Sequence, residues 1–112
     1  MMIEKVILNY LKEQLNVPVY MERPEKDTGE YVVIEKTGSG RMNHIDRATF
    51  ALQSFGNSLA RTAEINEDVK AAMDDLITLP EVSRSQLNSD YNYTDTQKKR
   101  YRYQAVYDIT HY

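Results

Sequence analysis

The C-terminal segment 101–112 constrains the fold most, because its side chains alternate strictly between two kinds. The even positions are mostly polar or charged, whereas the odd positions are aromatic or aliphatic: Tyr101, Tyr103, Ala105, Tyr107 and Ile109. A repeat of two is typical of a β-strand with one buried face. The segment therefore predicts a long strand, and its apolar side must be covered by a helix of the same chain or by another subunit.

The rest of the chain predicts two helices and four further strands. Apolar residues recur at helical spacing over 2–15 and 58–78, and strand-like segments cover 17–21, 31–36, 45–55, 82–92 and 100–112. The segments 22–30 and 37–44 are rich in charge or glycine and predict loops. The order α-β-β-β-α-β-β predicts a single α+β domain over residues 1–112. It has a mixed or antiparallel sheet of about five strands, with two helices on one face.

The predicted core combines both helices with the middle of the sheet. The second helix begins after an N-cap offered by the segment 56–58 and ends before Pro80. Its expected apolar stripe is Leu59, Ala63, Asn66, Val69, Met73, Leu76 and Ile77. We expect three groups to pack together: Ile3, Val6, Ile7, Tyr10 and Leu11; Val69, Met73 and Leu76; and Phe50, Leu52 and Val106.

Composition narrows the class of protein. The chain has no cysteine, which excludes disulfides and thiolate metal sites and fits an intracellular protein. Its N-terminus lacks the features of a signal peptide, and no apolar run is long enough to span a membrane. The formal net charge is −3, with seven bases and eight acids in residues 1–56 and seven and nine in 57–112. This balance does not favour a general nucleic-acid binder.

The sequence shows no pattern typical of an active site. The spacing of His44 and Asp46 is too short a motif for a metal site. The acidic neighbours Asp74 and Asp75 point in different directions from a helix. The glycine-containing segment 38–41 leads to a strand, not to the helix N-terminus that phosphate binding needs. We therefore expect no enzyme activity, no metal and no cofactor.

The segment 98–102 is the most basic part of the chain, and Tyr101 and Tyr103 are interleaved with its bases. We expect this segment to lie in a hairpin turn. Its charge has three possible roles: it keeps the turn solvated, it contacts phosphate, or it contacts an acidic protein surface. The chain has nine tyrosines, and tyrosine suits surfaces that are half buried and half solvated, such as subunit interfaces. The candidate interface residues are Glu25, Asp27, Glu30, Arg41, Lys98, Lys99, Arg100, Tyr101, Arg102 and Tyr103. We expect the bases of one subunit to meet Glu25, Asp27 or Glu30 of a neighbour, the C-terminal strand to lie at a sheet edge, and both loops to be free arms that order on assembly.

The whole chain resembles a known group of phage proteins in its length, element order and sequence texture. The segments that carry the resemblance are the opening helix 2–11, the strand 31–36, the helix end 72–76 and the final strand 101–109. In these features the chain is similar to head–tail joining and tail-terminator (tail-completion) proteins of long-tailed phages and prophages of Gram-positive type.

The resemblance implies a non-enzymatic protein that forms a homo-oligomeric ring, commonly a hexamer. Such a ring ends the tail tube and presents a surface to the head connector, and DNA passes through its channel. It would assemble in the cytoplasm of a bacterial host and remain in the virion. Three alternatives stay open on the residues alone: another minor capsid or tail-tube subunit, a small ligand-binding or enzymatic α+β domain, and a nucleic-acid binder.

Overall fold

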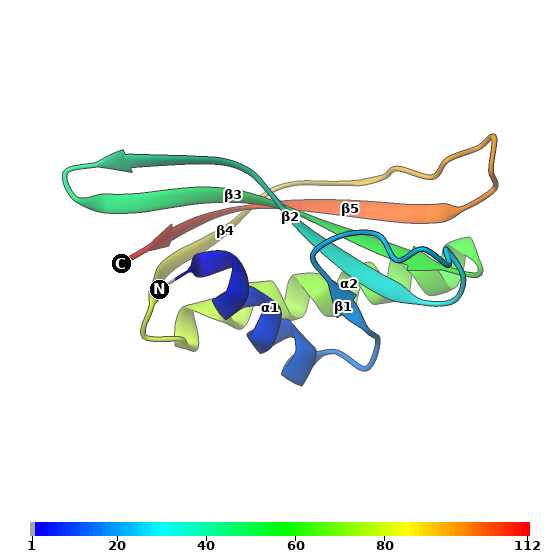
Figure 1. Cartoon of the computed structure of the whole chain (residues 1–112), viewed down its shortest axis with the longest axis horizontal. Coiled ribbons are helices and arrows are strands. Elements are labelled where there is room, and N and C mark those ends of the chain that lie inside the picture. The colour runs from blue at the N-terminus through cyan, green and yellow to red at the C-terminus, as the bar shows by residue number, and fades with distance from the viewer. Residues whose placement is uncertain (1) are drawn as a thin grey trace.

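Two helices and one five-stranded sheet make up the computed structural model, which describes residues 2–112 (Figure 1). The helices are α1 (Ile3–Gln14) and α2 (Leu59–Asp74), and a 3₁₀ turn, η1 (Asp75–Thr78), extends α2. The strands are β1 (Val19–Tyr20), β2 (Tyr31–Met42), β3 (Ile45–Gly56), β4 (Val82–Asn92) and β5 (Tyr101–His111). The predicted α+β class and the order of elements are confirmed.

The sheet has the strand order β1-β2-β3-β5-β4, in which only β1 and β2 run parallel. The expectation that the C-terminal strand lies at an edge is therefore wrong. β5 pairs with β3 from Asp46↔His111 to Gly56↔Tyr101 and with β4 on its other side. Its apolar face explains this central position, because Ala105, Tyr107 and Ile109 are each at most 1% exposed. The more polar β4 takes the edge instead.

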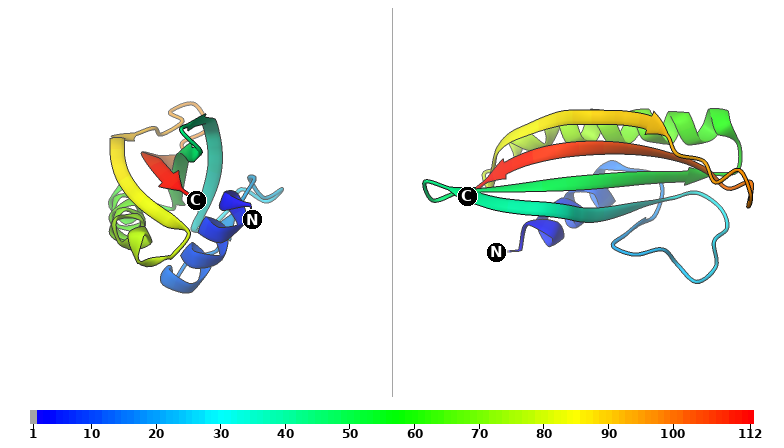
Figure 2. Two further views of the ribbon diagram at one scale, coloured as in Figure 1. Left: turned by 90° about the vertical axis from the view of Figure 1, so that its left-hand side faces the viewer. Right: turned by 90° about the horizontal axis from the view of Figure 1, so that it is seen from above.

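Both helices lie on the same face of the sheet, as Figure 2 shows. The core between them contains residues from every predicted group, including Ile7, Leu11, Phe50, Leu52, Val69 and Met73. Val106 does not belong to this core, because its neighbours Ala105 and Tyr107 point to the helices and alternation turns Val106 to the opposite face. Leu59 and Ile77 are exposed, and Thr62 and Ile65 take their places in the buried stripe of α2.

The segment 37–44, expected to be a flexible loop, is mostly strand. β2 continues to Met42 and pairs with β3 as far as Met42↔Ile45, so only Asn43 and His44 form the turn. Their φ angles are 52° and 66°, which suit the two central residues of a tight hairpin turn. The two glycines that suggested a loop lie within the strand. The resulting β2–β3 hairpin forms one end of a molecule that measures 44 × 25 × 24 Å (Figure 1).

Candidate interaction surface

The face of the sheet opposite the helices carries a second, smaller apolar cluster near the ends of β2 and β3. Tyr31, Val33 and Phe55 form it, and each is at most 4% exposed. Tyr31 and Phe55 are paired across the two strands, and their rings stack with centroids 4.6 Å apart. None of the helices in residues 2–112 covers this cluster. The segment 21–30 and the turn between β4 and β5 cover it instead.

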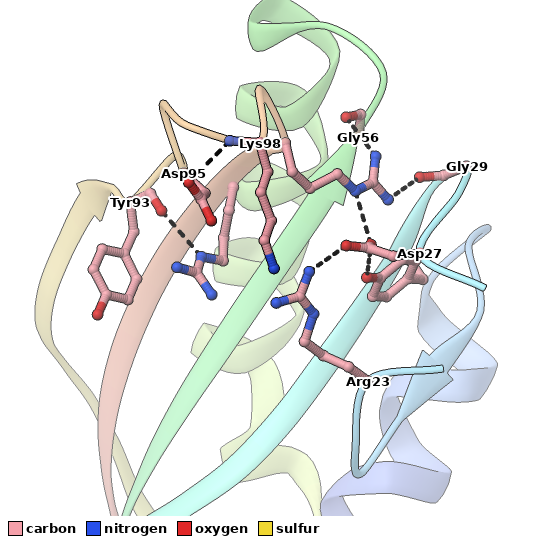
Figure 3. Close-up of polar contacts among 10 residues, drawn as sticks. Arg23, Asp27, Gly29, Gly56, Tyr93, Asp95 and Lys98 are labelled. Carbon is pink, nitrogen blue, oxygen red and sulfur yellow. Dashed lines mark hydrogen bonds and ion pairs between the residues drawn. The ribbon is translucent and has the colours of Figure 1, made fainter. Parts of the chain in front are cut away.

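Asp27 and Arg100 hold this cover in place through hydrogen bonds. Figure 3 shows the bonds at the labelled Asp27, Gly29 and Gly56. Asp27 accepts hydrogen bonds from Arg23, the Tyr31 hydroxyl and Arg100, the last at 2.9 Å. The Arg100 guanidinium also donates to the carbonyl oxygens of Gly29 at 2.7 Å and Gly56 at 3.0 Å. Only 12% of the Arg100 side chain is exposed. One arginine therefore joins the segment 21–30, the end of β3 and the β4–β5 turn.

Glycine is required at position 56, where β3 ends just before the first turn of α2. A Cβ atom at this position would lie 2.6 Å from the Thr62 hydroxyl and 3.2 Å from its amide nitrogen. The first turn of α2 is fixed there, because the Ser58 side chain accepts a hydrogen bond from the Arg61 amide at 3.1 Å. The N-cap expected at this segment is thus confirmed at Ser58.

Three arginines face the aromatic rings of this cluster. The guanidinium carbons of Arg23, Arg100 and Arg102 lie 4.9, 5.5 and 5.7 Å from the centre of the Phe55 ring. Arg102 also lies 4.2 Å from the centre of the Tyr93 ring and donates to the Tyr93 carbonyl oxygen at 3.0 Å. Cations over aromatic faces are favourable and hold the guanidinium groups in place. This end of the open face therefore presents fixed positive charge.

The charges of this cluster alter the titration of the groups within it. Burial alone would raise the pKa of Asp27, but hydrogen bonds from Tyr31 and Arg100, with the charges of Arg23 and Arg100, outweigh burial and lower that pKa. Burial, followed by the hydrogen bond to Asp27, raises the pKa of the Tyr31 hydroxyl. Asp27 is therefore a carboxylate and Tyr31 a neutral donor over the whole physiological range.

Exposed bases and tyrosines extend this surface along β4 and its turn. Tyr91 and Tyr93 are 42% and 48% exposed, and their rings meet edge to face with centroids 5.8 Å apart. Lys98 and Lys99 are exposed in the turn, and Figure 3 shows Lys98 above the sheet on the same side as Arg23. We call this surface the basic–aromatic patch; its residues are Arg23, Tyr91, Tyr93, Lys98, Lys99 and Arg102.

The structure divides the acidic and distal candidate residues among several places. Glu25 is exposed in the segment 21–30, whereas Glu30 pairs with Arg61 of α2 at 2.7 Å. Arg41 pairs with Asp46 at 2.7 Å on the β2–β3 hairpin, at the opposite end of the molecule from the β4–β5 turn (Figure 1). Arg41 is therefore not part of the basic–aromatic patch.

The remaining candidates lie near the patch but differ in orientation. Tyr101 and Tyr103 are half-buried and, by the alternation along β5, lie on the helix side of the sheet. Arg100 and Asp27 were expected to pair between subunits, but they pair within the chain. The segment 21–30 is likewise anchored by this pair and is not a free arm.

Sequence reasoning missed Arg23, Tyr31 and Phe55 as parts of this surface. The sequence places them in three separate segments, and only the register brings them together, through Tyr31↔Phe55 and Phe55↔Arg102. The available signal was weak: Phe55 and Tyr31 fall on the face that alternation turns away from the predicted core.

A second polar cluster lies on the helix side, at the middle of α2. The Asn66 amide, 2% exposed, donates to Asp90 at 2.7 Å, and Lys70 pairs with the other oxygen of Asp90 at 2.6 Å. The Tyr107 hydroxyl donates to Asp74 at 2.8 Å, and burial together with this bond raises the pKa of Tyr107. These contacts join α2 to β4 and β5. They explain why the polar Asn66 stands in the buried stripe of α2.

Residues 2–112 contain no group of three or more histidine or acidic side chains positioned to hold a metal ion. Over the same residues, none of the helices has the length and apolarity needed to cross a membrane. A surface hollow lies between the start of α1 and the β2–β3 hairpin, and it is open to solvent. No protein-family model and no curated protein matches this chain.

Proposed function

We propose that this protein is a non-enzymatic phage structural subunit that assembles as a ring at the head–tail interface, where it ends the tail tube or joins the tail to the head. The observation that carries the proposal is the sheet itself, which is covered by helices on one face only. Its other face bears the basic–aromatic patch, and tyrosine and arginine are the residues enriched at the centres of protein interfaces.

The shape of the subunit supports the same proposal. A sheet 11 to 12 residues long in four of its strands forms an elongated body, and the β2–β3 hairpin at one end carries exposed Met42 and Ile45, 61% and 47% exposed. Two different surfaces on one subunit favour head-to-tail association, which closes into a ring when the rotation between neighbours permits. Localisation in the host cytoplasm during assembly, and then in the virion, belongs to this proposal.

Native mass spectrometry of the full chain over a concentration series, with electron microscopy of the same samples, tests the proposal. We expect one closed oligomer with an axial channel, formed without any ligand. An open filament or tube of undefined length would instead favour a tail-tube subunit. A monomer at every concentration, with a small molecule retained in the spectrum, would contradict ring formation and favour the ligand-binding alternative.

A further inference from the structure

The outer face of α2 carries charge opposite to that of the basic–aromatic patch. Glu64, Glu67 and Asp68 follow one another along α2 at helical spacing, and Asp75 continues the series at the start of η1, with the small Ala71 between Asp68 and Asp75. Positions three and four apart lie on one side of a helix, so these carboxylates form a single stripe. The side chains of Glu64 and Glu67 remain 67% and 70% exposed, although each contacts one neighbouring base. We call these four residues the acidic stripe.

We propose that the basic–aromatic patch of one subunit docks on the acidic stripe of a second copy of this chain. This inference rests on the self-association proposed above and names the two surfaces that make it. Lys98 and Lys99 would lie against the carboxylates of Glu64 and Glu67. The exposed rings of Tyr91 and Tyr93 would pack over Ala71, where the absence of a long side chain leaves room for an aromatic ring.

The positions of the two surfaces suit a repeating contact. The acidic stripe belongs to the exposed side of α2 and η1, and α2 lies on the helix side of the sheet (Figures 1 and 2). The patch lies on the open face, so the two surfaces are on opposite sides of the sheet. A contact between them is heterologous: each subunit uses its patch toward one neighbour and its stripe toward the other. Such a contact leaves no unpaired surface once the ring closes.

The structure favours this contact over the acceptors suggested by the sequence. Asp27 and Glu30 pair with Arg100 and Arg61 of their own chain, and only 34% and 31% of their side chains are exposed. Glu64 and Glu67 also contact a base of their own chain but keep 67% and 70% of their side chains exposed. Arg23 is bonded to Asp27, but 43% of its side chain stays exposed, and Arg102 is half-buried against the Tyr93 ring. The acidic stripe is the largest group of exposed carboxylates that shares one face of a helix in residues 2–112.

The edges of the sheet are poorer surfaces for the same purpose. Both outer long strands are irregular: β2 shifts register between Lys36 and Gly38, and β4 does so between Val82 and Arg84 and again between Leu87 and Ser89. Bulges disrupt the regular row of donors and acceptors that an added strand needs, and natural sheets use them to block edge pairing. We therefore place the contact between faces and not between edges.

Charge reversal on each surface tests the proposal. Lys98→Glu with Lys99→Glu reverses the patch, and Glu64→Lys with Glu67→Lys reverses the stripe. Lys5→Glu with Lys12→Glu, on the exposed side of α1, is a matched control that changes the net charge as much as the first pair does. Circular dichroism confirms folding of each variant. Sedimentation velocity then measures self-association in about 50 mM and about 0.5 M salt.

We expect either reversal alone to weaken self-association at least about ten-fold at low salt, and the α1 control to leave it unchanged. A mixture of the two reversed proteins should assemble again, because each reversed surface then meets a reversed partner. Failure of the mixture to recover, or equal loss in the control, would overturn the proposed contact even if the wild-type ring forms. A wild-type monomer that binds a short single-stranded oligonucleotide through Lys98 and Lys99 would overturn it in favour of nucleic-acid binding.

Discussion

The two faces of the sheet are closed in different ways. On one face, two amphipathic helices cover a continuous apolar core that includes Ile7, Phe50 and Tyr107. On the other face, the small cluster of Tyr31, Val33 and Phe55 is covered by a polar segment that one arginine holds in place. The first face depends on apolar area, and the second depends on a few charged hydrogen bonds. The open face therefore presents fixed charge, whereas the helix-covered face buries apolar surface.

Two phenylalanines on β3 give the largest expected effects and the sharpest comparison. Phe50 and Phe55 are 0% and 1% exposed but face opposite sides of the sheet. Phe50→Ala should lower the free energy of unfolding by about 3–5 kcal/mol, the usual cost of a cavity in a packed core. Phe55→Ala should cost less, about 2 kcal/mol, because water can enter beneath the polar cover. Denaturant unfolding measures both, and equal costs would erase the distinction between the two faces.

Ile7→Ala tests whether α1 is a true part of the helix-covered face. Ile7 is fully buried, so its truncation should destabilise the protein by about 2–5 kcal/mol. Leu8→Ala on the half-buried side of the same helix is the control and should cost clearly less. Thermal and denaturant unfolding provide the measurement. A cost near zero for Ile7→Ala would mean that α1 is not docked on the sheet.

Arg100→Met tests the cover of the open face. The change leaves the carbonyl oxygens of Gly29 and Gly56 without their donor. It also removes the positive charge of Arg100 from beside the Asp27 carboxylate. The loss in unfolding free energy should be about 2 kcal/mol, the usual scale for hydrogen bonds to a charged group. The free energy of unfolding of Arg100→Lys should lie between those of the wild type and Arg100→Met, since one ammonium group cannot reach all three acceptors in the same geometry. An unchanged stability for Arg100→Met would show that this arginine does not hold the segment 21–30.

Acid should weaken the open face through Asp27. Its pKa is lowered in the folded protein, so its contribution to stability is present above the unfolded pKa of about 3.9 and is lost as pH falls through the folded pKa. The wild-type protein should therefore lose more stability between about pH 5 and pH 3 than Asp27→Asn does. Unfolding followed at several pH values gives the comparison. Parallel pH profiles for the two proteins would contradict the role of this carboxylate.

Much of the helix-covered face was predictable from the sequence, because period-two and helical repeats report directly on which side chains are buried. The alternation of 101–109 identified the apolar face of β5, and the stripe of α1 identified Ile7 and Leu11 correctly. The residue of β5 expected in the core, Val106, faces the other side. The errors arose where an element's pattern depends on its neighbours. Glycine content in 37–44 suggested a loop, yet pairing with β3 carries β2 through both glycines.

The candidate surface was predictable only in part. The basic segment 98–102 pointed to the right turn, but charge alone does not show that Arg100 is used within its own chain while Lys98 and Lys99 stay exposed. The aromatic members depend on strand register: Phe55 reaches Arg102 because β3 and β5 align at that pair. Register joins residues 47 positions apart, and no local pattern in the sequence reports it.

Zero-length cross-linking of the assembled protein tests most directly the claim that the open face meets α2 of a neighbour. A carbodiimide joins amines to nearby carboxylates, and mixed light and heavy isotope-labelled subunits separate links between chains from links within one chain. Lys70, which lies 2.6 Å from Asp90, provides the internal control for a link within the chain. We predict links between light and heavy chains that join Lys98 or Lys99 to Glu64, Glu67 or Asp68. Links between chains that fall only elsewhere on the molecule, or links confined to single chains, would contradict the account.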